Sequence, residues 1–585
     1  MTESFGDKPH WVPQPTHEDP ILETMGDVGV WQISIVVVMT LFNMPATLQL
    51  IAPEVEAMDG GFWCRRPPTL HNISIAEWIK LSGTTRPAEL GGLEYNPCNI
   101  KKLNFSLSYE EMMKSRSADE ITCTGWEYSQ EWWTIIAQFN LACSKLPINT
   151  LAESVFSAGA ACSCLIVGIA ADRHGRRSVL LVAQFVQMVT GIITGLSSSY
   201  TGYLVSTGIQ GFVCNALMTC TSVLCVEVTG GRWKSTMSVF YMYSYGLGYF
   251  TLAGLAYFFR RWNHLHIVIS LLSLLLFSFW WFLPESPRWL LTRNQLDGVM
   301  GVLEAAASIN SKPLPSDVVV RIKKMEVLYF SGQRNKVEVE MLFKTPIMKH
   351  LTVITPFIFF FIFISYYGLT LRKVTLFSIT DIMHVLMIKG GLEMIATSVA
   401  LILTYCPGIM FLVVSTLVEG ILCLASTLWP SRSPASMVLI LASRFFASVT
   451  NTSIAMTVAS FYPTSIRMTG LGWGYTCVGL ALFVATNVVN LGRISENLPQ
   501  VLFGTSACLG SVLLLLLPKQ LEESCDLISQ LENTEIKRDD IDISEMLRHV
   551  TTKRTLIRAE STRISSDRKS LKTTTSKSKV PFLRF

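Results

Sequence analysis

The segment "GIAADRHGRR", Gly168 to Arg177, ends one apolar run and begins the next with a dense group of charges. Asp172, Arg173, Arg176 and Arg177 fall within six positions, with a glycine between them. Glycine permits a tight turn, and basic residues mark the cytoplasmic loops of membrane proteins. The segment therefore predicts a short cytoplasmic turn between two membrane-spanning helices.

The composition is that of a polytopic membrane protein. Half of the 585 residues are hydrophobic, 16% are charged and the mean hydropathy is +0.39. A bilayer-spanning helix needs about 20 predominantly apolar residues, and a large soluble helical protein would need polar faces that "IVISLLSLLLFSFWWFLP" lacks. Twelve segments meet the requirement: 30–52, 147–171, 179–198, 202–228, 236–259, 265–284, 350–371, 381–404, 408–428, 435–459, 467–490 and 499–517.

The distribution of basic residues predicts that both termini are cytosolic. The opening thirty residues are polar and do not read as a signal peptide. Basic residues gather in "DRHGRR", "GGRWK", the 285–349 connection and the C-terminal tail, although Arg260, Arg261, Arg372 and Lys373 break the rule locally. The net charge of +5 is therefore a signal of topology and not of a nucleic-acid partner.

The connection 53–146 is predicted to be an extracellular loop. It contains two glycosylation sequons, at Asn72 and Asn104. Four cysteines accompany the sequons, and in an oxidising compartment they suggest two disulfides with three possible pairings. These cysteines are Cys64, Cys98, Cys123 and Cys143.

The second long connection divides the spans six and six. The predicted organisation is a cytosolic N-tail (1–29), a first six-helix bundle (30–284), a cytosolic linker (285–349), a second bundle (350–517) and a basic cytosolic tail (518–585). From Met546 the tail carries eleven Lys or Arg against two acids, so we expect it to be disordered. It either contacts anionic lipid of the inner leaflet or is merely solvated.

The turn at Asp172 resembles the motif that the major facilitator superfamily places between its second and third spans. "PESPRWLL" (284–291) resembles the segment after span six in organic ion transporters and sugar porters. "CTGWEYSQEWWTIIAQFNLAC" (123–143), "YLVSTGIQG", "FYMYSY", "YYGL" and "FYPTSIR" resemble the organic cation, anion and zwitterion transporters specifically. The paired glutamines of sugar porters are absent from "FIFFFIFISYYGLTL".

This resemblance implies an all-α membrane protein of twelve transmembrane helices in two six-helix bundles. It further implies a secondary transporter that moves small organic ions across the plasma membrane by alternating access. The resemblance implies no enzyme activity, cofactor or metal, and no P-loop pattern suggests ATP-driven transport. The alternative function is a transport-deficient relative that acts as a ligand sensor or binding protein.

The resemblance also predicts a cytoplasmic gate. The first half retains the family's complete charge set, whereas the second half has "LTYCPGIM" (403–410) at the equivalent turn and Ser460 where the family has an acid. We therefore expect a one-sided latch, with Asp172 paired across to another helix. The gate residues are Asp172, Arg173, Arg176, Arg177, Glu227, Arg232, Glu285, Arg288 and, from the second half, Arg467.

Family positions in the cavity favour cations or zwitterions over anions. The cations of anion carriers are replaced by Gly479 and Thr397, whereas the family's acid is retained as Glu393. Lys389 and Glu419 lie within apolar runs, where a structural ion pair and a substrate role are both open. The candidate substrate-binding residues are Glu393, Tyr367, Tyr245, Arg444, Gly479 and Met242.

Overall fold

The computed structural model describes most of the chain between residues 28 and 517. The described ranges are 28–58, 60–87, 93–103, 109–114, 119–229, 233–293, 295–314, 318–319, 322–323, 343, 346–371, 379–403, 409–430, 433–461, 467–493 and 495–517. The predictions about the N-tail and the basic C-terminal tail lie outside these ranges. Residues Met1–Pro518 form one compact unit, and the account below concerns that unit alone.

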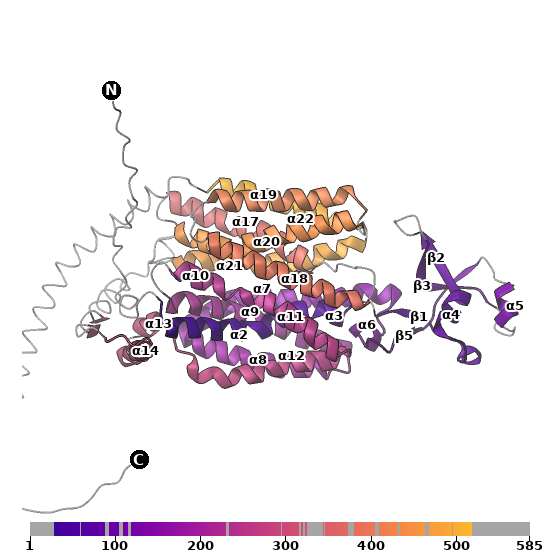
Figure 1. The fold of residues 1–585 in the computed structure, drawn as a ribbon, viewed down its shortest axis with the longest axis horizontal. Helices are drawn as coiled ribbons and strands as arrows, with labels where there is room; N and C mark the ends of the chain where they lie inside the picture. The colour runs from indigo at the N-terminus through magenta and orange to yellow at the C-terminus, as the bar shows by residue number, and fades with distance from the viewer. Residues whose placement is uncertain are drawn as a thin grey trace, which may run out of the picture. The chain divides into compact units, whose positions relative to one another are not determined.

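The first bundle is built from the six segments that were predicted to span the membrane before residue 285 (Figure 1). Its long helices pack closely where glycines face one another. A Cβ on Gly211 of α9 would collide with the backbone of Phe156 on α7, so these two helices approach at van der Waals distance. The helices are α2 (Val30–Ile51), α3 (Pro53–Glu56), α7 (Leu146–His174), α8 (Arg176–Gly195), α9 (Tyr200–Val228), α10 (Trp233–Phe240), α11 (Tyr243–Phe258) and α12 (Trp262–Phe277), followed by η3 (Ser278–Phe282).

The second bundle lies alongside the first and is drawn in salmon, orange and yellow in Figure 1. Pro356 stands inside α17, and neighbouring helices allow such a residue in a membrane helix. The helices are α17 (Pro346–Leu371), α18 (Ile379–Leu403), α19 (Ile409–Ala425), α20 (Pro434–Phe461), α21 (Arg467–Asn490) and α22 (Leu498–Leu515), with η4 (Ser426–Leu428) and η5 (Leu491–Arg493).

The described helices account for all twelve predicted spans, but two of them are not straight. Ten helices are long and apolar enough to cross a bilayer, and α7, bent by 44° between Thr150–Ser163 and Ile166–His174, makes eleven. The predicted span 236–259 is broken into α10 and α11. At the break, Met242 N–H bonds to Val239 and Tyr245 N–H bonds to Met242, which is the tighter i to i−3 pattern of a 3₁₀ turn.

The two bundles meet mainly along two helix pairs, α7 with α21 and α11 with α18, and α10 makes smaller contacts with α18 and α20. Both pairs join a helix of the first bundle to one of the second, so they define the seam between the bundles. Of the helices that contribute charges to the site described below, α18 borders this seam and α20 packs against α18.

The connection between α3 and α7 carries short strands, which the sequence did not predict. One sheet pairs β1 (Phe62–Cys64) with β5 (Trp126–Tyr128), and the other has the order β2 (Gly83–Pro87), β3 (Leu93–Lys101), β4 (Glu120–Thr122), all antiparallel. Short helices accompany them: η1 (Pro68–Leu70), α4 (Ile75–Ser82), α5 (Tyr109–Lys114), α6 (Ile135–Gln138) and η2 (Cys143–Lys145).

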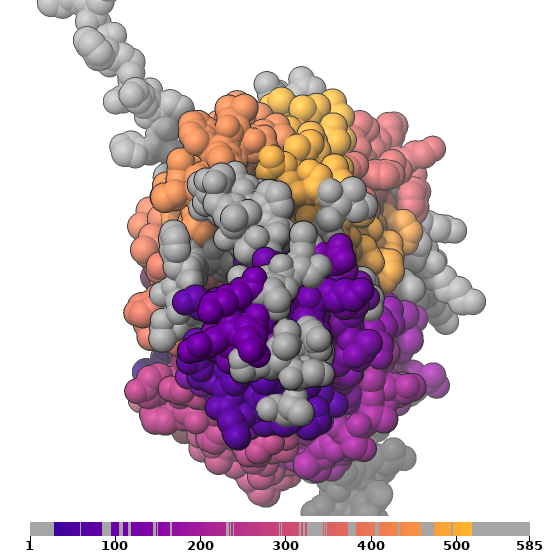
Figure 2. Space-filling model, turned by 90° about the vertical axis from the view of Figure 1, so that its right-hand side faces the viewer, coloured from indigo at the N-terminus to yellow at the C-terminus, as the bar shows by residue number. Residues whose placement is uncertain are grey.

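Disulfides hold this loop together and attach it to the bundle. Cys64 pairs with Cys123, and Cys98 pairs with Cys143, directly before α7. Asn72 is exposed, whereas Asn104 lies outside the described residues. We call the end of the bundles that bears this loop the loop side; Figure 2 shows it face on, with the loop in purple over the lower, first bundle.

At the opposite end, part of the predicted linker is helical and packs on the first bundle. The two helices are α13 (Pro287–Thr292) and α14 (Leu296–Ile309). Asn310, at the end of α14, accepts a hydrogen bond from Trp31 N–H at 3.0 Å and donates one to Gln32 Oε1 at 2.9 Å. Because Gly29 gives α2 no side-chain cap, Asn310 satisfies a backbone donor that would otherwise be orphaned.

Candidate functional site

Four charged side chains meet inside the protein at the seam, and we call them the buried quartet. They are Glu54 of α3, Lys389 and Glu393 of α18 and Arg444 of α20. None of the four exposes more than 8% of its surface. Since burying an unpaired charge is very costly, the geometry of their pairing decides what they can do.

The first pair crosses from one bundle to the other. Lys389 Nζ donates to Glu54 Oε2 at 2.5 Å. The other oxygen of Glu54 accepts a hydrogen bond from the hydroxyl of Tyr249 on α11 at 3.2 Å. Glu54 thus has both oxygens satisfied, one of them by a cation of the second bundle.

The second pair is looser and lies within the second bundle. Arg444 Nη2 lies 3.8 Å from Glu393 Oε2, beyond ordinary hydrogen-bond distance. Glu393 instead accepts hydrogen bonds from Ser448 Oγ at 2.7 Å and from the Tyr366 hydroxyl at 3.3 Å. Glu393 is therefore held by two neutral donors and one nearby cation.

Tyr249 links the two pairs. Arg444 Nη2 donates to the Tyr249 hydroxyl at 2.9 Å, and its guanidinium carbon lies 5.1 Å from the centre of the Tyr249 ring. Lys389 Nζ lies 6.0 Å from the same ring centre. A cation over an aromatic face is stabilised by about 0.5–2 kcal/mol, so this one side chain of the first bundle engages both cations of the second.

The last turn of α17 completes the surroundings of the two cations. Arg444 Nη1 donates to the carbonyl of Thr370 at 3.3 Å, and Lys389 Nζ lies 3.5 Å from the same oxygen. Carbonyls at a helix C-terminus carry partial negative charge and favour cations. Arg444 nevertheless has one buried donor, Nε, with no hydrogen-bond partner.

The buried quartet has no net formal charge, but not all of its hydrogen-bonding groups have partners. Two carboxylates and two cations give a formal charge of zero. The 3.8 Å gap between Arg444 and Glu393 and the unpaired Nε leave one acceptor and one donor that a ligand could engage. A group carrying both a positive and a negative charge would meet a complementary partner for each.

The other predicted substrate residues are placed less directly. Tyr367 is buried and packs against Tyr366 with ring centres 5.3 Å apart. Tyr245 is buried with its hydroxyl 3.5 Å from the sulfur of Met218, and Gly479 is buried on α21. Met242 stands at the break between α10 and α11. The structure brings Glu393 and Arg444 together through their side chains.

Two members of the site were missed in the sequence, and a third, Lys389, was identified without its partner. Glu54 was overlooked because it stands at the end of the first span, where an acid is ordinary. Tyr249 was passed over in favour of its neighbours in "FYMYSYGLGYF". Lys389 was recognised as buried, but nothing in one sequence shows that its partner lies 335 positions away. The cue that was present is the acid pair in "PEVE", Glu54 and Glu56, directly after an apolar span.

The predicted gate residues form a second charged group, which we call the turn cluster. It is centred on Arg176, which contacts Asp172 at 2.7 Å and Glu227 of α9 at 3.3 Å. Glu285 accepts the backbone N–H groups of Arg176 at 2.9 Å and Arg177 at 3.2 Å. Gly175 between the helices has φ +93° and no room for a Cβ against the Glu285 carboxylate, which explains the glycine in the motif.

The contacts of Asp172 lie beside the turn and do not reach the second bundle. Its carboxylate is 74% exposed and pairs with Arg176, the first residue of α8. Its backbone carbonyl accepts hydrogen bonds from Trp289 Nε1 and Arg293 Nη2, both at 2.9 Å. These contacts of Arg176, Glu285 and Asp172 therefore lie within the first bundle and the helix that follows it.

The remaining gate residues have supporting positions or lie outside the described residues. Arg177 donates to the carbonyl of Trp280 at 3.2 Å and lies over its ring. The carbonyl of Arg173 accepts from Arg293, and Arg288 belongs to α13. Arg232 and the side chain of Arg467 lie outside the described residues.

Among the described residues, no group of three or more His, Cys, Asp or Glu side chains is placed to hold a metal ion.

Glu419, the other buried acid noted in the sequence, accepts a hydrogen bond from Ser365 at 2.5 Å. It has no cation within ion-pair distance among the described contacts, and its second oxygen is unpaired. It does not belong to the quartet.

Comparison with known proteins identifies the architecture. Residues 109–514 match the family model described as "Sugar (and other) transporter". The chain is 27% identical to solute carrier family 22 member 13 of Homo sapiens, over 85% of this chain and 90% of that protein. It is 27% identical to solute carrier family 22 member 3 of Mus musculus (86% and 93% covered) and 25% identical to organic anion transporter 3 of Homo sapiens (88% and 94% covered).

Solved structures agree on the fold. The proton:xylose symporter XylE of the major facilitator superfamily, bound to 6-bromo-6-deoxy-D-glucose, superposes with a TM-score of 0.56 at 14% identity, covering 84% of this chain and 96% of that one. The partially occluded inward-open XylE from E. coli gives a TM-score of 0.55 at 13% identity, covering 82% and 96%. The chain therefore belongs to the sugar (and other) transporter family and, within the major facilitator superfamily, to the organic ion transporters.

Proposed function

We propose that this protein is a secondary transporter of small organic ions that works by alternating access at the plasma membrane. The loop side faces the exterior and both termini face the cytosol. The observation that carries the proposal is the buried quartet. Its Glu54–Lys389 pair joins the two bundles at 2.5 Å, and such a contact must break or exchange partners when the bundles rock about the seam.

The charge balance of the quartet favours zwitterions, then cations, over anions. Glu393 supplies an acid for a positive group, and the unpaired Nε of Arg444 supplies a donor for a carboxylate. A simple cation could bind Glu393 only in competition with Arg444, which lies 3.8 Å away. An anion could engage the Arg444 Nε, but Gly479 and Thr397 stand where the family's anion carriers have cations, so we expect its binding to be weakest.

Uptake into cells that express the full chain tests this function. Three labelled substrates are compared at equal surface expression: a carnitine-like zwitterion, a quaternary ammonium cation and a urate-like anion. We expect uptake above that of untransfected cells in the order zwitterion, cation, anion. Saturable uptake of the anion alone would contradict the charge preference. No uptake of any class, with the protein at the surface, would favour the transport-deficient alternative.

A further inference from the structure

The first span ends in a short helix whose orientation is only partly fixed by the backbone. α2 ends at Ile51, and α3 begins at Pro53. Proline has no backbone N–H, so Pro53 cannot donate to a carbonyl of α2. The turn that follows is tight, since Val55 N–H bonds to the carbonyl of Ala52 at 3.0 Å. Side-chain contacts of α3 therefore contribute to its rotation about the helix axis.

Two acids of α3 point to opposite sides and reach different bundles. Glu54 and Glu56 are two residues apart, which corresponds to about 200° around a helix. Glu54 pairs with Lys389 of the second bundle, whereas Glu56 contacts His266 on α12 of the first. This one helical turn is therefore bound from both sides.

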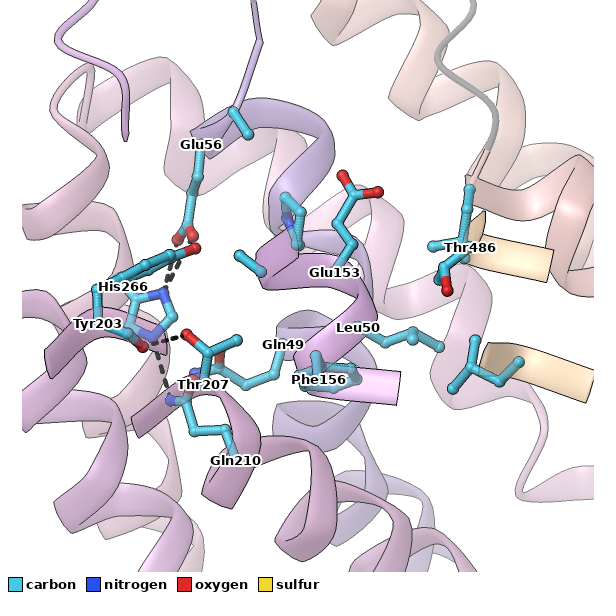
Figure 3. A pocket seen from close by; sticks show the side chains of 15 residues that line it. Gln49, Leu50, Glu56, Glu153, Phe156, Tyr203, Thr207, Gln210, His266 and Thr486 are labelled. Atoms are coloured by element: carbon cyan, nitrogen blue, oxygen red, sulfur yellow. Dashed lines mark hydrogen bonds and ion pairs between the residues drawn. The ribbon is translucent and has the colours of Figure 1, made fainter. Parts of the chain in front are cut away.

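His266 holds both oxygens of the Glu56 carboxylate. Its Nδ1 lies 2.9 Å from Oε1 and 3.1 Å from Oε2 of Glu56. A carboxylate can only accept, so Nδ1 donates. At the other side of the ring, Nε2 lies 3.1 Å from the amide nitrogen of Gln210. Figure 3 shows these contacts running from Gln210 through His266 to Glu56.

The contact between Glu56 and His266 is buried, so water cannot replace either partner. Glu56 exposes 2% of its surface and His266 exposes 4%. A buried carboxylate that loses its donor is strongly destabilising. A rotation of α3 that separates Glu56 from His266 is therefore opposed.

His266 itself belongs to a closely packed part of the first bundle. Ser270, one turn further along α12, donates to the carbonyl of His266 at 2.8 Å and accepts from Gln49 Nε2 of α2 at 3.3 Å. A Cβ on Gly191 of α8 would collide with Ser270 Oγ, so α8 and α12 are in close contact here. The ring is thus fixed relative to the first bundle, and α3 takes its position from the ring.

The same rotation of α3 satisfies both acids. A shift by one residue turns a helix by about 100°, which would take Glu54 away from Lys389 and Glu56 away from His266 together. Tyr249 also contacts Glu54, at 3.2 Å, but it belongs to the quartet's own hydrogen bonds. His266 acts on α3 from outside the quartet.

We infer that His266 and Glu56 are positioning residues for the ion pair that joins the two bundles. Their hydrogen bond sets the rotation of α3 and so places Glu54 opposite Lys389. The inference deepens the proposed function and rests on it for the role in transport, because it names the first-bundle contact that sets the strength of the pair that must break when the bundles rock. The placement of Glu54 can be tested without transport.

A cross-linking experiment measures this placement directly. The variant Glu54→Cys, Lys389→Cys is purified as the full chain in lipid nanodiscs and treated with 1,2-ethanediyl bismethanethiosulfonate. Mass spectrometry of the digested protein follows the linked peptides. Adding His266→Leu should slow the link by about fivefold or more, because the rate of such a reaction depends on how the two groups are held. His266→Asn should stay within about twofold, since its amide N–H can still donate to Glu56.

A second cysteine pair on the seam provides the control. Ser154 Oγ of α7 lies 3.2 Å from Asn487 Oδ1 of α21, and neither helix includes α3. The link in Ser154→Cys, Asn487→Cys should form at the same rate with and without His266→Leu. An unchanged rate between positions 54 and 389, or an equal fall at both pairs, would overturn the inference.

Unfolding midpoints provide a test without cysteines. His266→Leu should lower the midpoint in the unsubstituted protein. In the background Glu54→Gln, Lys389→Met the fall should be at most about two-thirds as large, because there is no ion pair left to position. In the background Glu419→Gln, which changes a buried acid outside the quartet, it should be as large as in the unsubstituted protein. Equal falls in all three backgrounds would show a purely local role.

Two further points keep the tests decisive. If His266→Leu does not fold, Glu56→Gln, His266→Leu replaces it, since this variant leaves no buried carboxylate without its donor. Neither measurement requires uptake, so a protein that fails to transport would refute the proposed function and leave these tests valid. Intact uptake with additive midpoints would remove the positioning role and leave the transporter.

Discussion

The turn cluster and the buried quartet both consist of arginine, acid and backbone contacts, yet they lie in opposite settings. The turn cluster holds α7, α8, α9 and α13 together within one half of the molecule, and Asp172 faces solvent. The quartet lies across the seam, and its four members are buried. A bundle that moves as a unit keeps contacts of the first kind, whereas motion between bundles must break those of the second.

This difference changes the meaning of the sequence motif. The charges of "GIAADRHGRR" predicted a cytoplasmic latch, and the missing charges of the second half predicted that this latch is one-sided. In the structure the contacts of Arg176 brace the first half, whereas Glu54 and Lys389 form an ion pair that joins the two halves. The asymmetry between the halves remains, but this inter-bundle ion pair is formed by α3 and α18 and not by the turn.

Removing one partner of the inter-bundle pair is expected to have the largest effect. Lys389→Met leaves Glu54 buried without its cation, and breaking a buried pair in this way costs about 3–5 kcal/mol. Thermal unfolding of the purified protein in detergent should show a lower midpoint than that of Lys312→Met, which removes an exposed lysine.

The double variant Glu54→Gln, Lys389→Met sharpens this result. It removes both charges, so most of the lost stability should return, because the remaining cost is that of two neutral side chains. A double variant that is as unstable as the single one would show that the penalty does not come from the unpaired Glu54 carboxylate.

Arg176→Ala is expected to cause the second-largest loss of stability. Comparing it with Asp172→Asn distinguishes the contribution of Arg176 from that of Asp172. Glu227 exposes 7% of its side chain and would lose its cation, at a cost of about 2–3 kcal/mol. Asp172→Asn removes an exposed partner, and such pairs contribute about 0–1 kcal/mol. Unfolding midpoints of the two variants give the comparison. A larger loss for Asp172→Asn would restore Asp172 as the main element of a latch.

Glu393→Gln should affect transport more than stability. The amide keeps the hydrogen bonds to Ser448 and Tyr366 in one orientation but removes the charge that a positive substrate group needs. We expect uptake of zwitterions and cations to fall about tenfold, which corresponds to 1.4 kcal/mol. Robust anion uptake that is unaffected by Glu393→Gln would contradict the assignment of Glu393 to the substrate site.

Much of the fold was accessible from the sequence because apolar length alone identifies membrane helices. The break at Met242 was not, since "VFYMYSYG" is continuous in hydropathy and the 3₁₀ turn arises from packing. The strands of the loop were missed because β1 and β5 have three residues each and are paired across more than sixty positions. Charged residues in spans could be flagged individually, but pairing Glu54 with Lys389 requires the seam between the bundles.

A third ion pair, between Arg66 and Glu127 of the loop, is more exposed than the buried quartet. Its loss is expected to have the smallest effect on stability. Arg66 Nε lies 2.9 Å from Glu127 Oε2, with 17% and 19% of the two side chains exposed. Partial burial opposes ionisation of Glu127, but hydrogen bonds from Trp63 and Arg66 outweigh it and lower the pKa of Glu127 below its ordinary value.

The sign of the pH effect follows from that direction. A carboxyl whose pKa is lower in the folded state adds stability above the unfolded value, and this stability is lost as the pH falls through the folded value. We expect a loss of at most about 1 kcal/mol below about pH 4.5, the ordinary value for glutamate. Because Trp63 and Glu127 face each other in the β1–β5 ladder, amide hydrogen exchange in residues 62–64 and 126–128 reports this loss of stability directly.

After correction for intrinsic rates, protection from exchange should fall between pH 5 and pH 3 in the unsubstituted protein. The same fall is expected in the control variant Glu131→Gln, which removes an exposed acid of the loop. It should change less with pH in Glu127→Gln, since that variant has no carboxylate to protonate at this position. Equal pH dependence in all three proteins would show that Glu127 does not control the acid stability of the loop.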